Sequence, residues 1–320
     1  MLLTNNATFV SENRQSVADL IVSTLGKSYQ EAEKTIASTG ISNLSVFQND
    51  ELMGLMKIAV EILNGKNVGI LGGVSAIIVV SQTYDMALPS ISTRIQGLLG
   101  LSSKTFCIDV NDGCCGFIKA SKIAKMLIES GYSKVLVISG DINSRITKNS
   151  DLSTRILFGD GFSFSTFEAS NDSYVSELHN NGLDAEFIRC KMNTSELIMN
   201  GFEVFRFTKN VVPPLMREFL KKIDGDEIDL VGLHQASRLI VNSLSSSLAI
   251  STRYGDFFNC SKIGNLGSGS IGSWLANVPE VPFNKKLKML AIGYGAGLSW
   301  GVANFCVNID GINEVISVNY

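Results

Sequence analysis

The sequence predicts an α/β protein with buried, largely parallel strands. Short apolar runs alternate along the chain with stretches of helical periodicity, which is the pattern of α/β domains. The 320 residues are 45% hydrophobic and only 18% charged, a composition that can bury a large core and leave apolar surface for an oligomer. The runs that we expect to form strands are residues 76–82, 106–110, 135–139, 162–167, 230–233 and 289–292.

Two segments carry a helical pattern. Residues 118–129 repeat apolar side chains at the spacing of one helix face. Residues 215–223 form the second segment and follow Pro213 and Pro214, which suit the first turn of a helix and not its interior.

The polar stretch at residues 168–173 (EASNDS) is the best candidate for a boundary near the middle of the chain. A strand, a glycine-containing turn and a helix are expected on both sides of it, in FCIDVNDGCCGFIKA and in FFNCSKIGNLGSGSIGSW. We therefore expect two related halves, residues 1–169 and 170–320.

The composition limits the possible functions. The net charge is −3 and no stripe of Lys and Arg interleaves with aromatic residues, which argues against nucleic-acid binding. The longest apolar stretch, residues 68–80, is too short and too glycine-rich to span a membrane, and the first residues lack a secretory pattern. We therefore expect a cytosolic protein without a membrane partner.

Cysteine and histidine usage points away from metal binding. The six cysteines, at positions 107, 114, 115, 190, 260 and 306, show no CxxC spacing, which predicts reduced thiols. Only two histidines occur, at positions 179 and 234, which excludes a His-rich metal site. No metal and no cofactor is expected.

Cys114 is the first candidate for chemistry. It follows an expected strand in DVNDGCCGF and precedes a helix, and Gly113 permits the tight turn between them. A thiol at a helix start is expected to have a favoured thiolate, and the N–H groups there are suited to bind an oxyanion. A buried structural cysteine is the ordinary alternative. Local physics does not exclude the neighbouring Cys115 from the same role.

Three further segments are candidates. His234 ends an apolar strand, where α/β enzymes place their sites, although a lone histidine is more often a core residue. Asn265 lies among glycines and serines that let the backbone approach a ligand, although Asn is also common in turns. The glycines of GYGAGLSWG, residues 293–301, let a backbone N–H face a substrate oxygen or form a simple turn.

The glycines after Asn265 also match a dinucleotide-binding pattern, which we reject. Gly267, Gly269 and Gly272 have the GxGxxG spacing, but the preceding strand is short and no acidic residue follows about 20 positions later.

In this order the segments closely resemble the β-ketoacyl-[acyl-carrier-protein] synthase III family. The matching motifs are DVNxxCxGF, FGDG, HQA, GN followed by small residues, and a terminal GxGxGxxWG, at residues 109–117, 158–161, 234–236, 264–271 and 293–301. The resemblance implies a thiolase-like, five-layered αβαβα fold of two pseudo-symmetric halves, usually a homodimer. It extends from about residue 39 to residue 305, and the opening strand of the family is not obvious in the first 35 or so residues.

The resemblance also implies residue roles. Cys114 is the nucleophile, His234 and Asn265 are its partners, and the backbone N–H groups of Cys114 and Ala296 form the oxyanion hole, with Ala296 in place of the family's glycine. Leu88 matches the residue that reaches into the acyl pocket of the other subunit. The implied reaction moves an acyl group to Cys114 and condenses it with a malonyl thioester to a 3-oxoacyl product.

The donor of the acyl group is less clear from the resemblance. Relatives that load from coenzyme A stack its adenine between a Trp and an Arg, whereas this chain has EKTIAS before TGI and Leu152 at the place of the Arg. Arg206 matches a basic residue that docks the carrier protein, and Arg238 lies one position from another. An acyl-carrier protein is therefore the more favoured donor, with acyl-CoA as the other.

Three other functions remain possible on the sequence alone. A thiolase-fold acyltransferase would move an acyl group to an amine or a hydroxyl. A non-catalytic partner subunit of this fold would be expected to lack the cysteine, whereas Cys114 is present. A cysteine hydrolase is the most distant alternative.

Overall fold

The computed structural model describes residues 1–66, 69–148, 151–191, 196–223, 228–248, 251–279 and 281–320. Its strands are β1 (Leu2–Ser11), β2 (Arg14–Ser16), β3 (Asn43–Ser45), β4 (Ala76–Ser81), β5 (Phe106–Asn111), β6 (Lys134–Asp141), β7 (Gly161–Glu168), β8 (Tyr174–Asn180), β9 (Ile188–Lys191), β10 (Glu196–Met199), β11 (Leu230–Leu233), β12 (Leu287–Gly295), β13 (Ser299–Val307) and β14 (Asn313–Val318). Its helices are α1 (Val17–Leu25), α2 (Tyr29–Thr39), α3 (Leu52–Gly65), α4 (Ile91–Leu98), α5 (Gly116–Glu129), α6 (Leu152–Arg155), α7 (Gly201–Asn210), α8 (Val212–Lys222), α9 (Arg238–Leu248) and α10 (Ser270–Ala276), with short 3-10 turns η1 (Asn143–Arg145), η2 (Gly182–Phe187) and η4 (Gly267–Gly269).

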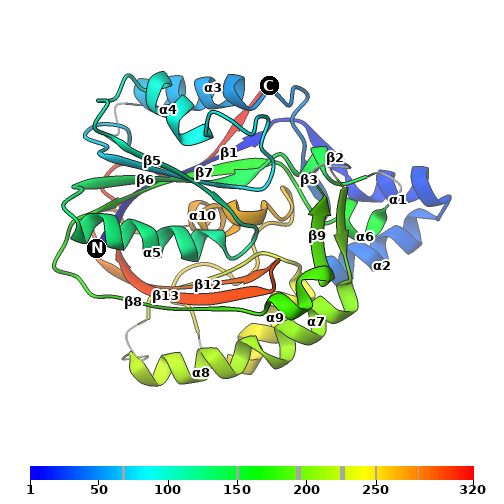
Figure 1. The fold of residues 1–320 in the computed structure, drawn as a ribbon. Coiled ribbons are helices and arrows are strands. Elements are labelled where there is room, and N and C mark those ends of the chain that lie inside the picture. The colour runs from blue at the N-terminus through cyan, green and yellow to red at the C-terminus, as the bar shows by residue number, and fades with distance from the viewer. Residues whose placement is uncertain (67–68, 149–150, 192–195, 224–227, 249–250, 280) are drawn as a thin grey trace.

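Helices and strands stack in five layers, as Figure 1 shows. The helices α3 and α4 cover one face of a sheet ordered β5-β4-β6-β7-β1, and α5 and α10 pack against its other face. Below them is the sheet β11-β12-β13-β8, whose outer face carries α7, α8 and α9. This is the αβαβα arrangement that the sequence resemblance implied.

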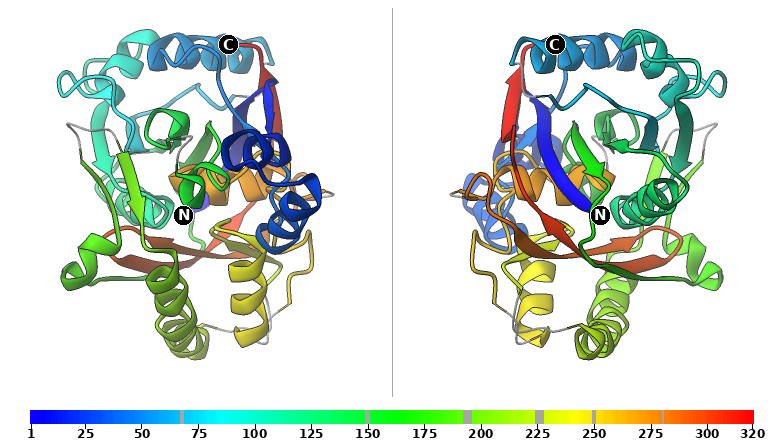
Figure 2. Two further views of the ribbon diagram at one scale, coloured as in Figure 1. Left: turned by 90° about the vertical axis from the view of Figure 1, so that its right-hand side faces the viewer. Right: turned by 90° about the vertical axis from the view of Figure 1, so that its left-hand side faces the viewer.

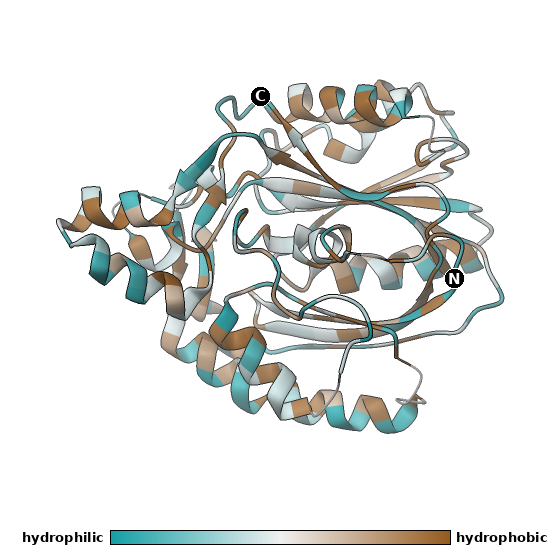
Figure 3. Ribbon diagram, turned by 180° about the vertical axis from the view of Figure 1, so that it is seen from behind, coloured by the Kyte–Doolittle hydropathy of each residue, from teal (hydrophilic) through white to brown (hydrophobic). Residues whose placement is uncertain are grey.

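Successive apolar residues of the strands point to both faces of each sheet, so both faces are covered by other elements. Successive side chains of a strand point to opposite faces. Ile78 packs in the central core with α5 and α10, whereas Ile77 packs under α3. Likewise, Met289 faces the central core and Leu290 packs with the outer helices α8 and α9. The outer helices alternate between hydrophobic and hydrophilic residues, as expected for helices with one buried face (Figure 3).

The first strand connects the two sheets. β1 pairs antiparallel with β7 along most of its length, and its residues Leu2 and Leu3 pair parallel with Cys306 and Val307 of β13. The last strand, β14, runs parallel beside β1, so the first and last strands are neighbours in one sheet (Figure 2). The opening strand that was not obvious from the sequence is therefore a central element.

The expected strands all occur, with ends shifted by a few residues, and α5 and α8 form where helices were predicted. Pro213 and Pro214 lie in the first turn of α8, as expected. The strands are not largely parallel, however. β4 is parallel to β5 and β6, but β7 runs antiparallel to β1 and β6. In the second sheet β11 and β12 are parallel, but β13 runs antiparallel to β12 and β8, so each sheet is mixed. For β12 and β13 the reason is their short connection, which spans only residues 296–298.

The chain passes from the first sheet to the second between β7 and β8, at residues 169–173. That is the region of the boundary expected from the sequence. Because β14 returns to the first sheet, the division into residues 1–169 and 170–320 stays a prediction.

An aromatic contact across the central layer gives a test of this packing. The rings of Phe167 in β7 and Phe305 in β13 meet edge to face, with centroids 5.7 Å apart. Phe167→Ala should lower the free energy of unfolding by about 3–5 kcal/mol, because it leaves a cavity between the two sheets. Denaturant or thermal unfolding measures this change, and Phe283→Ala is the control because that side chain is 58% exposed. A small effect of Phe167→Ala would contradict a single core shared by both sheets.

Candidate active site

Cys114 lies in the turn between β5 and α5, at the carboxyl end of a parallel strand. Gly116, the first residue of α5, is pressed against β4, since a Cβ there would come 2.3 Å from Val80 Cγ1. Gly295 is equally close to the cysteine, because an added Cβ would lie 2.8 Å from Cys114 Cβ and 3.3 Å from its Sγ. The glycines therefore let the end of β12 lie directly against Cys114.

Cys115 is fully buried, whereas Cys114 is partly exposed and lines a cavity of about 230 Å³. The same cavity is lined by His234, Asn265 and Ala296. The structure therefore brings together the four residues that the motifs singled out, and it favours Cys114 over its neighbour for a reaction with a bound molecule.

His234 directly follows β11 and is only 2% exposed. Its backbone N–H donates to the Ile292 carbonyl (2.9 Å), and its backbone carbonyl accepts a hydrogen bond from the Tyr294 hydroxyl (3.1 Å). The Tyr294 ring also stands edge to face against the imidazole, with centroids 5.2 Å apart. Strand β12 thus fixes the histidine from two sides.

Asn265 is held by both its backbone and its side chain. Its N–H donates to the Leu157 carbonyl (2.8 Å), and its carbonyl accepts the Gly159 N–H (3.0 Å). Its side-chain oxygen accepts the N–H of Gly267 and the hydroxyl of Ser270, both at 2.9 Å. The amide nitrogen lies on the side of His234, 3.5 Å from its Nε2, and both residues line the cavity.

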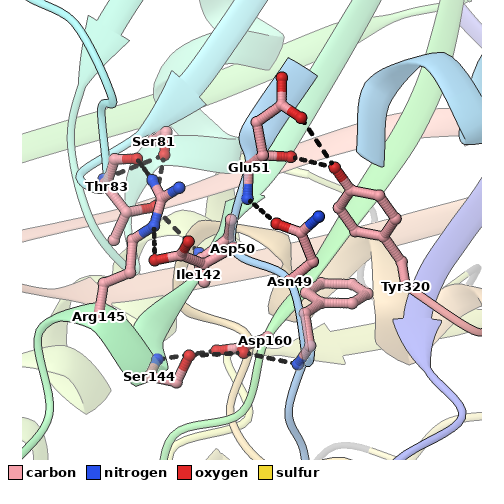
Figure 4. Close-up of polar contacts among 11 residues, drawn as sticks. Asn49, Asp50, Glu51, Ser81, Thr83, Ile142, Ser144, Arg145, Asp160 and Tyr320 are labelled. Carbon is pink, nitrogen blue, oxygen red and sulfur yellow. Dashed lines mark hydrogen bonds and ion pairs between the residues drawn. The ribbon is translucent and has the colours of Figure 1, made fainter. Parts of the chain in front are cut away.

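The FGDG motif holds Asn265 through the Gly159 N–H, and Asp160 anchors the motif to the neighbouring segments. This buried carboxylate accepts the N–H (2.8 Å) and the hydroxyl (2.8 Å) of Ser144, as Figure 4 shows, and also the N–H of Phe47 (3.0 Å). Burial raises the pKa of Asp160, and these hydrogen bonds oppose the rise. Gly159 must be glycine here, because a Cβ would lie 1.9 Å from the Ile263 carbonyl oxygen. The motif therefore has a positioning role.

Burial sets the charge states of the site. It lowers the pKa of His234 to about 3, so the imidazole is neutral near neutral pH. Burial also raises the pKa of Cys114, and the nearby carboxylates of Asp141 and Asp112 raise it further. The expectation that the helix start favours the thiolate is therefore not met, because desolvation and these charges outweigh it. The resting thiol is protonated.

Asp141 at the end of β6 was not recognised from the sequence. Its pKa is raised to about 6 by burial, against hydrogen bonds from the Gln82 N–H (2.7 Å) and the Ser81 hydroxyl (2.8 Å). Through them it fixes Gln82, which lines the cavity beside Cys114. No motif marked this residue, because its proximity to the cysteine arises only when β6 pairs with β4.

Ala296 tolerates the place of a glycine. It lies between β12 and β13, and its carbonyl accepts the Ser299 hydroxyl (2.7 Å). The left-handed conformation of this loop falls on Gly297, with φ of 131°, and not on Ala296. An alanine is therefore unstrained at the position expected to supply an oxyanion-hole N–H.

The structure does not place the remaining predicted residues in the lining of this cavity. Leu88 lies in the loop before α4 and is 84% exposed in the single chain. Arg206 is exposed on α7, where it pairs with Glu203. Arg238 begins α9 and lies over the Phe258 ring, 5.4 Å from its centroid.

Two classes of site find no support in the described ranges. No three Cys, His, Asp or Glu side chains gather there in a way that would hold a metal ion. Among the same residues, every helix is too short or too polar to span a bilayer.

With this geometry in place, comparisons with known proteins are informative. The family model described as 3-oxoacyl-[acyl-carrier-protein (ACP)] synthase III matches residues 108–182, and the model of its C-terminal part matches residues 220–306. The chain is 30% identical over 275 residues to the beta-ketoacyl-[acyl-carrier-protein] synthase III of Acholeplasma laidlawii, which covers 83% of this chain and 86% of that relative. This chain belongs to the 3-oxoacyl-[acyl-carrier-protein] synthase III family.

Solved structures of family members show the same fold. The 3-oxoacyl-(acyl-carrier protein) synthase of Burkholderia xenovorans superposes with a TM-score of 0.88 at 23% identity, over 99% of this chain and 97% of that one. The synthase III of Thermus thermophilus superposes with a TM-score of 0.84 at 27% identity, over 95% and 98% of the two chains.

The charge state of this synthase III family member can be tested by alkylation. Because the pKa of Cys114 is raised, only a small fraction is thiolate at neutral pH, and that fraction grows about tenfold per pH unit. Iodoacetamide should therefore label Cys114 at a rate that rises through about pH 9 without levelling off. Peptide mass spectrometry identifies the labelled cysteine, with Cys114→Ala as the control. A rate that reaches a plateau near neutral pH would show a favoured thiolate instead.

Proposed function

We propose that this protein is a decarboxylating condensing enzyme of the β-ketoacyl-[acyl-carrier-protein] synthase III type. It would take an acyl group from a thioester onto Cys114 and condense it with a malonyl thioester to give a 3-oxoacyl product. The malonyl thioester that we favour is malonyl-[acyl-carrier protein]. One observation carries the proposal. Cys114, His234 and Asn265 line one cavity, and the Asn265 amide oxygen is engaged, with its nitrogen 3.5 Å from His234 Nε2.

In the first step, the sulfur of Cys114 attacks the carbonyl carbon of the acyl thioester. The oxyanion that forms accepts hydrogen bonds from the backbone N–H groups of Cys114 and Ala296, the arrangement that stabilises such intermediates. The thiol proton passes to the departing donor thiolate as the intermediate collapses to the new thioester. His234 stays neutral in this step, because its low pKa makes it too weak a base to hold the proton.

In the second step, a malonyl thioester enters with its carbonyl oxygen between His234 and Asn265. Loss of CO2 leaves an enolate, and the two side chains donate hydrogen bonds to its oxygen. The enolate carbon attacks the acyl carbon on Cys114, and the cysteine leaves as a thiolate that takes up a proton. A pure acyl transfer to an amine or a hydroxyl needs no paired donors for an enolate, so the observed Asn265 geometry favours condensation.

The surroundings of the cavity support a carrier protein as donor. Ser38, Thr39 and Ser153 line the cavity where coenzyme A-loading relatives of the family grip adenine, and Leu152 begins α6 there. Arg206 and Arg238 are exposed close to the catalytic cavity, since Val204, Ser237 and Leu239, which are near them in the chain, line it. Exposed cations are suited to attract an acidic carrier protein.

We also propose a homodimer that works in a reducing compartment such as the cytosol. β5 is the last strand in the order of its sheet and its residues are only half-buried, which suits pairing with a second copy. Leu88 and Met86 expose apolar side chains in the loop that follows β4. Asp109 of β5 anchors the helix after this loop by accepting the N–H groups of Ile91 (2.6 Å) and Ser92 (2.9 Å). The six free cysteines agree with a reducing compartment.

The test of the function is release of CO2 from a malonyl thioester together with formation of a 3-oxoacyl product. His234→Ala and Asn265→Ala should each slow condensation on the order of 10²–10³-fold, the cost of one lost oxyanion donor. Cys114→Ala should abolish the acyl-enzyme seen by intact-protein mass spectrometry. His179→Ala is the matched control, because that histidine lies on β8 outside the cavity. Acyl transfer to an amine or a hydroxyl without CO2 release would establish the acyltransferase instead.

The donor is tested by comparing acyl-carrier and acyl-CoA thioesters. Without adenine stacking, binding of coenzyme A should be weaker by about one to two powers of ten, so the carrier thioester should load Cys114 faster. High salt and the double change Arg206→Glu, Arg238→Glu should reduce this advantage, because exposed charges act through screened attraction. Lys57→Glu on α3 is the control for charge alone. Equal loading rates that respond neither to salt nor to charge reversal would contradict carrier docking at these arginines.

A further inference from the structure

A second cavity of about 400 Å³ adjoins the catalytic one. Gln82, Gly113 and Ala296 line both cavities, and Gly113 directly precedes Cys114 in the chain. The shared wall means that an acyl group on Cys114 lies next to this second space. Its lining therefore bears on which acyl group the enzyme takes.

The lining of the second cavity is charged. It contains three cationic side chains, Lys119, Arg145 and Arg189, and one anionic side chain, Asp112. Lys119 and Asp112 form an ion pair within the lining. Both linings also contain apolar side chains, and Ile188 and Leu197 belong to both. The catalytic cavity differs in charge, because its described lining contains no Lys, Arg, Asp or Glu.

The partners of the two arginines lie outside the lining of the cavity. Arg145 Nε contacts Asp50 at 3.1 Å, as Figure 4 shows, and the Asp50 side chain is 67% exposed. Arg189 contacts Glu186, which is 80% exposed. Ion pairs with carboxylates so exposed contribute little, so they are readily exchanged for another carboxylate.

Arg145 is anchored and still has donors for a ligand. One of its terminal nitrogens donates to the Thr83 carbonyl (3.4 Å), which fixes the guanidinium at the end of β4. A guanidinium has five N–H donors, and two of them are recorded in use among the described residues. An apolar acyl chain would desolvate these cations without offering them a hydrogen-bond acceptor, which is unfavourable.

We propose that the second cavity receives the far end of the acyl group on Cys114, and that this group is a short dicarboxylic acyl chain such as succinyl or glutaryl. Its free carboxylate pairs with Arg145 and Lys119, with Arg189 adding positive charge. The inference rests on the proposed function, because it assigns the substrate class of the same acylation step. That step is unchanged: the Cys114 sulfur replaces the donor thiol, which leaves with the proton.

The experiment compares two acyl groups of similar shape on one small donor. Succinyl-pantetheine and 4-methylpentanoyl-pantetheine differ in the charge of the terminal group and share the same handle. We expect succinyl to load Cys114 about ten- to hundredfold faster, the range for hydrogen bonds to a charged group. Intact-protein mass spectrometry over time gives both rates and their ratio.

Three variants locate the origin of this ratio. Arg145→Gln and Lys119→Gln should each remove most of the preference. Asp50→Asn removes only the outer partner of Arg145, so the ratio should stay the same or rise. Lys57→Gln removes one exposed cation from α3 and should leave the ratio unchanged. Melting temperatures of all variants confirm that each one is folded.

The outcomes separate this inference from the proposed function. Equal or faster loading of 4-methylpentanoyl by the unaltered protein would overturn the dicarboxylic assignment alone. The same holds for a succinyl preference that survives both Arg145→Gln and Lys119→Gln. A protein that loads none of these acyl groups, acetyl included, from either pantetheine or the acyl-carrier protein would overturn the proposed function as well.

Discussion

Strand β12 and the start of α5 are in contact with no room for a side chain between them. A Cβ on Gly293 would lie 3.0 Å from Cys115 Cα, and one on Gly295 would lie 2.8 Å from Cys114 Cβ. This contact brings the end of the second sheet against the nucleophile of the first. Because His234 bonds to Ile292 of the same strand, the contact also sets the place of the histidine. A larger residue at Gly293 or Gly295 would separate the parts of the site.

The layered fold was predictable where the hydrophobic pattern is simple. β4, β6 and β11 are continuous apolar runs because both of their faces are buried. β1 gave no such signal, since Thr4 and Thr8 lie among its buried residues. These hydroxyls meet Thr166 (3.0 Å) and Ser163 (2.7 Å) of β7, so each one bonds to a partner more than 150 positions away. Sequence periodicity carries no information on such a partner.

The site residues that could be predicted from the sequence are those that lie in short motifs. Cys114, His234, Asn265 and Ala296 each lie in a short pattern, and they line one cavity as expected. The charge state of the thiol was not predictable, because it depends on burial and on Asp141, which reaches the cysteine only through the pairing of β6 with β4. The rejected GxGxxG has a packing role. A Cβ on Gly269 would lie 2.8 Å from the Ser139 carbonyl oxygen of β6, and one on Gly272 would lie 2.6 Å from Ser163 Cβ of β7. These glycines let the start of α10 lie against the first sheet.

A raised thiol pKa is consistent with covalent catalysis when all three states of the sulfur are compared. Burial disfavours the thiolate of Cys114, and the neighbouring Asp141 carboxylate disfavours it further. A thioester on the same sulfur is uncharged, so the same surroundings do not oppose the acyl-enzyme. In the proposed reaction the thiolate forms only when the enolate attacks, after loss of CO2 has made that step favourable. The environment that disfavours the thiolate of Cys114 therefore stabilises the acyl-enzyme relative to that thiolate. In this way the acyl group stays on Cys114 until the second substrate arrives.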